Sequence, residues 1–150
     1  MTISDDHYMS VWEATTQQLI STVYQPAIPT ALEVSKDGNT SFVGTVIGAC
    51  RAYDLQNRSK PRLVMQQKFF EESIPISCIK TSIDGKYTLF SSVQSKNVFV
   101  LSASAVDGFQ VLAFIQFEAN VCSASFLSVD NVMKVVVVLD NNLLGSANVH

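Results

Sequence analysis

The sequence predicts an all-β fold built from repeated four-stranded antiparallel units, and an internal repeat is the main reason. Half-apolar runs ending in a tight turn recur in residues 30–39, 77–86 and 122–131. The turn residue Asp84 follows Asp37 by 47 positions, and Asp130 follows Asp84 by 46. A period in the forties is typical of architectures in which each repeat is one supersecondary unit.

The segments between these turns have the pattern of short strands. Runs rich in Val, Ile, Phe, Thr and Ser are separated by turn residues at a spacing of about 8 to 12 residues, as in all-β domains. No segment sustains the apolar spacing of an amphipathic helix. We therefore expect strands throughout the chain and no helix.

The expected strands fall into four units, residues 1–26, 27–72, 73–119 and 120–150. They are residues 2–4, 8–13 and 19–24 in the first unit; the run before Asp37, then 40–46, 49–54 and 62–69 in the second; 76–82, 86–92, 97–102 and 109–117 in the third; and 122–127, 133–139 and 143–149 in the fourth.

The strand count gives the expected architecture. Four-stranded units repeating every 40 to 45 residues or so are the blades of β-propellers. We predict a β-propeller of four-stranded antiparallel blades, with two complete blades and two partial ones that lack the first and the last strand respectively. A β-sandwich or another type of propeller is the structural alternative.

The first unit also carries a family motif. Ser4, Asp6, Trp12 and Glu13 form a Ser-x-Asp-x5-Trp-Glu run. It resembles the Ser-x-Asp-x5-Trp-Asp run of the WD-repeat (WD40) propellers, and Tyr53-Asp54 is a weaker counterpart in the second unit. The Gly-His pair of that family is absent, so we expect packing to hold each blade more than a buried polar network.

Composition limits the function classes. The chain has 150 residues, 47% hydrophobic and 15% charged, with a net charge of −3, which fits one globular unit and disfavours nucleic-acid binding. We expect no nucleic-acid partner, no membrane span and no secretory route. Three cysteines without metal-type spacing, Cys50, Cys78 and Cys122, are expected to be buried thiols in a reducing intracellular compartment, most simply the cytoplasm.

The sequence offers little for catalysis. A nucleophile needs a base within reach, but the only histidines are His7 and His150. The acidic pairs Asp5-Asp6 and Glu71-Glu72 are expected to lie in turns and loops. The repeated turn aspartates suit tight hairpins, and they are too far apart for one metal site. We predict no enzyme activity, no metal site and no cofactor.

The expected function is therefore a non-enzymatic scaffold for protein–protein interaction within a larger intracellular assembly. The resemblance to WD-repeat propellers implies this role, and cytoskeletal or ciliary complexes are among the possible settings. The alternative is a propeller enzyme or small-ligand sensor that uses the central channel. Apolar first strands, whose only charged residues are Glu33 and Lys80, disfavour that alternative.

Exposed loops at the two ends of the blades are the candidate partner contacts. The turns between second and third strands contain Asp6, His7, Gln94, Lys96 and Asn141. At the opposite end, the loop after the third strand of the second unit contains the basic group Arg58, Lys60 and Arg62.

Four units cannot form a closed ring of the usual seven blades, and open ends would expose apolar surface. We expect that the propeller is completed by further blades of a longer chain, by a second copy or by a partner chain.

Overall fold

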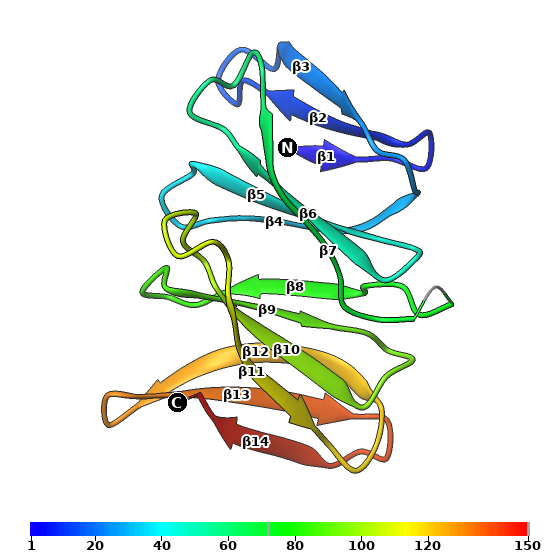
Figure 1. Ribbon diagram of the computed structural model, residues 1–150, viewed down its shortest axis with the longest axis vertical. Helices are drawn as coiled ribbons and strands as arrows, with labels where there is room; N and C mark the ends of the chain where they lie inside the picture. The colour runs from blue at the N-terminus through cyan, green and yellow to red at the C-terminus, as the bar shows by residue number, and fades with distance from the viewer. Residues whose placement is uncertain (72, 150) are drawn as a thin grey trace.

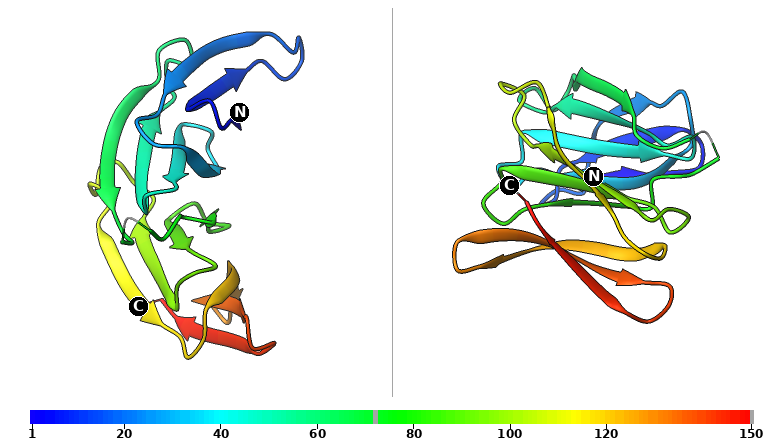
Figure 2. Two further views of the ribbon diagram at one scale, coloured as in Figure 1. Left: turned by 90° about the vertical axis from the view of Figure 1, so that its right-hand side faces the viewer. Right: turned by 60° about the horizontal axis from the view of Figure 1, so that its bottom comes forward.

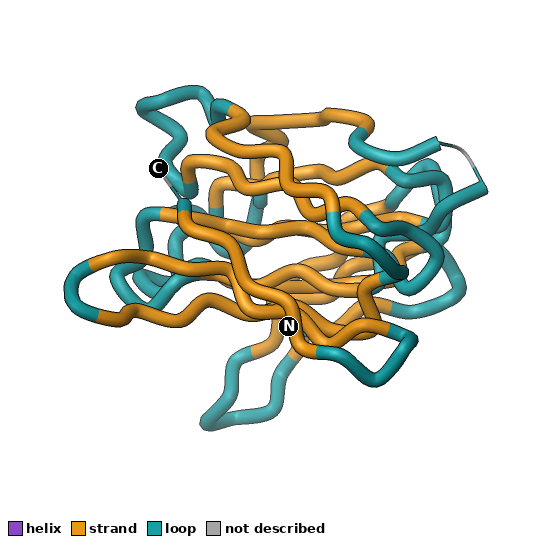
Figure 3. Tube along the Cα trace, turned by 90° about the horizontal axis from the view of Figure 1, so that it is seen from below, coloured by secondary structure: helices purple, strands orange, loops and turns teal. Residues whose placement is uncertain are grey.

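The computed structural model describes residues 1–71 and 73–149, and these contain fourteen strands and no helix (Figure 1). Figure 3 shows strands through the body of the molecule, with loops gathered at the strand ends. Because the described residues form no helix, none of them belongs to a helical segment able to cross a membrane.

The strands form four antiparallel sheets in chain order. The sheets contain β1 (Thr2–Ile3), β2 (Tyr8–Trp12) and β3 (Leu19–Tyr24); β4 (Pro29–Val34), β5 (Thr40–Thr45), β6 (Ala49–Asp54) and β7 (Arg62–Lys68); β8 (Cys78–Thr81), β9 (Tyr87–Ser91), β10 (Asn97–Ser102) and β11 (Val111–Gln116); and β12 (Val121–Val129), β13 (Val132–Leu139) and β14 (Leu144–Asn148). The all-β prediction of three, four, four and three strands is confirmed.

The four sheets stack face to face along an arc. Figure 2 shows this curvature, with β3, β7 and β11 on the convex side and β4 and β8 on the concave side. Side chains join neighbouring sheets near the concave side: Thr30 Oγ1 donates to Ile76 O at 2.6 Å, and Thr81 N donates to Glu33 Oε1 at 3.1 Å. The stacking is that of consecutive propeller blades.

Each gap between sheets is filled by an apolar cluster. Phe42 and Phe90, both fully buried, meet edge to face between the second and third sheets with ring centroids 6.2 Å apart. Leu89, Val135 and their neighbours fill the gap between the third and fourth sheets. A smaller cluster around Met9 joins the first sheet to the second.

Two of the three repeated turns are the same structure. Ser35 Oγ donates to Asp37 Oδ1 at 2.6 Å and accepts from Thr40 N, and Gly38 has φ of 74°. In the third sheet, Ser82 and Asp84 make the same bonds, again at 2.6 Å from hydroxyl to carboxylate. The left-handed backbone conformation costs glycine little, which explains why a glycine follows the aspartate in both turns.

The third turn differs. Val129 pairs directly with Val132, so Asp130 and Asn131 form a two-residue hairpin in which both have positive φ, 51° and 61°. The ladder therefore extends beyond the predicted range, and β12 and β13 are longer than expected.

The first strand of the third unit is clearly shorter in the structure than predicted. Residues 76–82 were expected to form a strand, but β8 covers only Cys78–Thr81. Ile76 N donates to Thr45 O of the second sheet at 3.1 Å, so this residue leaves its own ladder to join the neighbouring blade. Ser82 belongs to the turn.

Candidate functional site

The turns that link the second and third strands of each unit lie at one end of the stack. In Figure 1 the turns β1–β2, β9–β10 and β13–β14 all lie on the right-hand side. These turns carry Asp6, His7, Gln94, Lys96 and Asn141. The residues therefore share one end of the molecule, although they stand on three different sheets.

Within the first of these turns the polar groups are already engaged. Asp6 Oδ1 accepts hydrogen bonds from Ser4 Oγ and from Tyr8 N, the latter at 3.3 Å. His7 has a φ of 73°, its Nδ1 lies 3.1 Å from Gln25 O, and its ring stacks on Tyr24 with centroids 5.8 Å apart. The histidine is held by the first sheet, and among the described residues no Ser, Thr or Cys side chain is shown in a hydrogen bond with its ring.

The other turns at this end present their side chains to solvent. Gln94 and Lys96 are exposed, and only their backbone groups are bonded: Gln94 N donates to Ser92 Oγ at 3.2 Å, and Phe117 N donates to Lys96 O at 2.9 Å. Asn141 is exposed and accepts from Leu143 N at 3.2 Å through Oδ1. Gln94 and Lys96 can contact a partner without breaking a side-chain bond that the structure shows.

The basic loop, residues 57–62, lies at the opposite end of the strands (Figure 1). Its backbone is fixed on the first sheet, because Ser21 Oγ donates to Arg58 O at 2.7 Å. Arg62 pairs with Asp54 at 3.1 Å, and the pKa of the Asp54 carboxyl is lowered by hydrogen bonds from Gln56 N and then from Arg62. Arg58 and Lys60 are exposed, so this loop is anchored but has two free cationic side chains.

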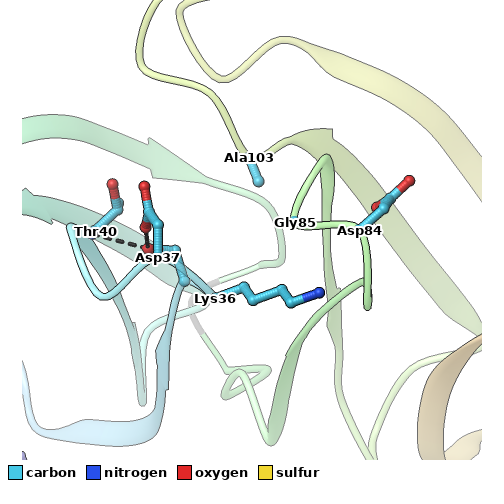
Figure 4. A pocket seen from close by; sticks show the side chains of 7 residues that line it. Lys36, Asp37, Thr40, Asp84, Gly85 and Ala103 are labelled. Carbon is cyan, nitrogen blue, oxygen red and sulfur yellow. Dashed lines mark hydrogen bonds between the residues drawn. The ribbon is translucent and has the colours of Figure 1, made fainter.

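A shallow hollow of about 300 Å³ lies between the second and third sheets, at the end that carries the basic loop. Figure 4 shows Asp37 and Asp84 on opposite walls, with Lys36 reaching across to the third sheet, where Nζ donates to Ile83 O. Ala103 lies between the two turns in this view (Figure 4). The hollow therefore lies where the β4–β5 turn meets the β8–β9 turn.

Hydrogen bonds lower the pKa of both carboxyl groups of the hollow. Bonds from Ser35 Oγ and Asn39 N hold the pKa of Asp37 below its ordinary value of 3.8. Partial burial acts to raise the pKa of Asp84, but bonds from Ser82 and Lys86 outweigh it, and the pKa is lowered. Within the described residues, no three His, Cys, Asp or Glu side chains gather in a way that could hold a metal ion.

Two acidic pairs were considered for catalysis at the sequence level. Asp6 of the first pair is used in its turn, as described above, and Asp5 is exposed. In the second pair, Glu71 lies in the connection from β7 to β8, and Glu72 lies outside the described residues, as does His150. Asp37 and Asp84, the carboxylates of the hollow, belong to neither of these pairs.

The expectation of three buried thiols is wrong in part. Cys50 is fully buried, and this burial raises the pKa of its thiol. Cys78 is half-buried, with Sγ 3.6 Å from Ala124 O of the next sheet, whereas Cys122 is exposed. The register shift between Val121 and Ser123 accounts for the error, because strict alternation cannot predict which way a residue at a bulge points.

A partly buried polar relay between the first and second sheets was missed at the sequence level. Gln25 is fully buried, and its Oε1 accepts from Tyr53 Oη at 3.1 Å. Arg51 donates to Tyr53 Oη at 3.1 Å and to Gln66 Oε1 at 2.7 Å. The only sequence signal for this relay was Tyr53, a tyrosine at the position of the WD-repeat tryptophan. Trp12, at the corresponding place in the first sheet, instead donates from Nε1 to Thr2 Oγ1 at 3.0 Å.

Comparison with known proteins supports the fold more strongly than any family. No family model matches the chain. The β-propeller domain of Cps50 (Swd1) from Myceliophteria thermophila superposes with a TM-score of 0.76 at 10% identity, over 97% of this chain and 46% of that one. The chain is also 33% identical over 55 residues, 37% of its length, to the pre-mRNA-splicing factor cwf17 of Schizosaccharomyces pombe.

These matches show a β-propeller architecture. The chain spans about half the length of the propeller it superposes on and 16% of the splicing factor.

Proposed function

We propose that the chain is a WD-repeat-type propeller segment that acts as a non-enzymatic protein-interaction scaffold in an intracellular multiprotein assembly. The predicted units, residues 1–26, 27–72, 73–119 and 120–150, are its blades. Support comes from the propeller fold and from the local similarity to a pre-mRNA-splicing factor. Neither comparison supports a cytoskeletal or ciliary setting. The proposed assembly fits either the cytoplasm or the nucleus.

The observation that carries the proposal is the anchored basic loop. Binding residues are often on loops held by a rigid scaffold, because a fixed loop loses little entropy on binding. Ser21 and Asp54 fix the loop at Arg58 O and at Arg62, while the side chains of Arg58 and Lys60 remain exposed. In a protein of net charge −3, this local cationic group favours an acidic segment of a partner protein.

The alternative, a ligand site in the central channel, has less support. Ala31, Ile79 and Ala124 of the first strands are buried. The polar groups there are used between blades, since Glu33 accepts from Thr81 N and Thr30 donates to Ile76 O. Of the two charged residues on the first strands, Glu33 is engaged between blades and Lys80 is exposed, so a single charged side chain remains there for a substrate.

The test is affinity purification of the full chain with two loop variants. The basic-loop variant is Arg58→Glu with Lys60→Glu, and the matched control at the other end is Gln94→Ala with Lys96→Glu. We expect a stoichiometric partner with the wild-type chain, loss of that partner with the basic-loop variant and retention with the control. Circular dichroism confirms that both variants are folded.

Loss of the partner with the control variant alone would contradict the assignment of the contact to the basic loop. Failure of the wild-type chain to retain any stoichiometric protein would contradict the scaffold role itself.

A further inference from the structure

The turns between second and third strands differ in chemistry along the stack. Turn positions usually carry Gly, Pro, Asn, Asp or Ser, because these residues suit tight backbone conformations. The first and fourth units follow this rule with Asp5-Asp6 and Asp140-Asn141. The β5–β6 turn instead carries Val46-Ile47, and the β9–β10 turn carries Val93. Turn geometry does not account for these exposed β-branched side chains.

Together with one residue of the β3–β4 connection, these side chains form an apolar row across the second and third sheets. The row consists of Ile28, Val46, Ile47 and Val93, each between 37% and 49% exposed. Within the second sheet, Val46 N donates to Ile28 O at 2.9 Å, so these two residues are neighbours.

The start of the third unit links the two halves of the apolar row. Ile76 N donates to Thr45 O at 3.1 Å, directly before Val46. The next residue, Ser77, accepts a hydrogen bond through Oγ from Val93 N at 3.2 Å. The apolar row therefore bridges two complete blades.

The backbone beneath the apolar row is fixed without a partner. Gly48 O accepts from Phe69 N at 2.9 Å and from Phe70 N at 3.1 Å, which fastens the turn after Ile47 to the β7–β8 connection. A Cβ on Gly48 would lie 2.8 Å from Glu71 O, so the backbone of Glu71 lies against the same turn. A surface held in this way loses little conformational entropy on binding.

The apolar row lies at an acidic end of the molecule. Every second link between strands lies at this end, from the β1–β2 turn to the β13–β14 turn, on the right in Figure 1. Among the described residues, these links and the adjoining last residue of β7 hold five acidic residues and two lysines: Asp5, Asp6, Glu71, Glu118 and Asp140, with Lys68 and Lys96. The other described residues are nearly balanced, with seven acidic and eight basic side chains. The negative charge of the protein is therefore concentrated around the apolar row.

We infer that the acidic end is a second docking surface, and that its occupant is a cationic, partly apolar segment of a partner protein. The apolar side chains of that segment lie on the apolar row, and its Lys or Arg side chains lie beside the surrounding carboxylates, of which Glu71 is next to the row. Complementary charge selects the partner, and burial of apolar area contributes affinity. The same charge disfavours nucleic acid and anionic lipid as occupants.

This surface is separate from the basic loop of the proposed function. The basic loop lies at the opposite end of the strands and is proposed to take an acidic partner (Figure 1). The chain would then hold two partners of opposite charge at its two ends.

The first test compares three fluorescent decapeptides by anisotropy with the full chain. The probe alternates lysine with leucine. One reference is oligolysine, which keeps the charge alone, and the other has glutamine in place of every lysine. We expect the lysine–leucine peptide to bind at least about tenfold more tightly than either reference, and to bind less tightly as salt is added. Equal binding of either reference, or no binding of the probe, would overturn the inference.

Two charge insertions test where the lysine–leucine peptide binds. Ile47→Lys and Val93→Lys should each weaken its binding at least about tenfold, because each replaces an apolar contact with a like charge. The matched control is Val106→Lys, which adds the same charge at a side chain that is 96% exposed at the opposite end. The control should bind as the wild-type chain does. Equal losses in all three variants would mean that total charge controls binding, and would overturn the inference.

A carboxylate next to the apolar row is tested in the same way. Glu71→Gln should weaken binding of the lysine–leucine peptide about two- to fivefold, as expected for one exposed ion pair. Asp130→Asn removes one charge at the opposite end and should have no effect. A larger loss with Asp130→Asn than with Glu71→Gln would overturn the placement of the cationic segment.

Amide chemical shifts of the ¹⁵N-labelled wild-type chain provide a measurement that does not depend on variant folding. The lysine–leucine peptide should shift the signals of Val46, Ile47 and Val93, and leave those of Gly38 and Gly85 at the opposite end unchanged. Shifts confined to the opposite end would overturn the inference. Arg58→Glu with Lys60→Glu should not weaken binding of this peptide, so the two docking surfaces can fail separately.

Discussion

The interface between the second and third sheets and the outer faces of the terminal sheets use the same kinds of residue but differ in what covers them. Phe42 and Phe90 are fully buried, and Phe69 stacks on Phe90 with ring centroids 4.9 Å apart. Val138 and Leu144, on a strand face of similar character, remain exposed. Burial depends on the neighbouring sheet rather than on the strand, so stability is concentrated in the middle of the stack.

The largest expected effect is on the middle interface. Phe42→Ala should lower the free energy of unfolding by about 3 to 5 kcal/mol, because it removes a fully buried ring and leaves a cavity. Val138→Ala on the exposed face should cost less than about 1 kcal/mol. Urea unfolding at low protein concentration measures both changes. Equal losses of stability for the two variants would contradict the contrast between the middle interface and the outer faces.

A smaller effect separates two glycines that share one backbone conformation. Gly48 and Gly38 both have φ of 74°, but a Cβ at Gly48 would lie 2.7 Å from Phe70 O, whereas nothing lies within 4 Å of one at Gly38. Gly38→Ala should cost about 1 kcal/mol from the left-handed conformation alone. Gly48→Ala should cost clearly more, because the β7–β8 connection must move.

Thermal unfolding of the two alanine variants measures the difference. A melting temperature for Gly48→Ala equal to or above that of Gly38→Ala would show that the β5–β6 turn does not contact the following connection as described.

The sequence was sufficient to predict the strands and turns, because these depend on local chemistry. Asp37-Gly38 and Asp84-Gly85 form the predicted hairpins, and all fourteen strands lie where the alternating runs indicated. Contacts between sheets were not predictable in the same way. The buried Gln25–Tyr53 bond joins residues 28 positions apart, and the exposure of Cys122 depends on a register shift.

The candidate partner contacts were also predictable only as far as local sequence determines them. The sequence placed the two candidate loop groups on opposite ends through strand order alone, and the structure has this arrangement (Figure 1). It could not show that the basic loop is anchored, because the bond from Ser21 to Arg58 O crosses from one sheet to the next. The functional roles of these loops stay predictions.

The repeated turns predict a dependence of stability on pH. The pKa of Asp37 is lowered by Ser35 and Asn39, so its carboxylate contributes stability that is fully present above the ordinary pKa of 3.8. That contribution is lost as the pH falls through the lower pKa of the folded state. The melting temperature should therefore fall below about pH 4, and Ser35→Ala should make the fall less steep.

Asp130→Asn is the matched control for this effect. The structure shows no side-chain hydrogen bond to Asp130 among the described residues, and its turn is held by backbone conformation. The variant should keep the acid-induced fall of the wild-type chain between pH 7 and pH 3. An unchanged profile for Ser35→Ala would show that the Ser-Asp turns do not contribute to it.

The smallest expected effect on folding is at the outer face itself. Leu144 is 76% exposed, so Leu144→Ser removes little buried surface and should change the free energy of unfolding of the dilute chain by less than about 0.5 kcal/mol. Urea unfolding of the dilute chain measures this change. A loss of stability as large as that of Phe42→Ala would mean that the outer face is already part of the core, and the contrast between the middle and the ends of the stack would fail.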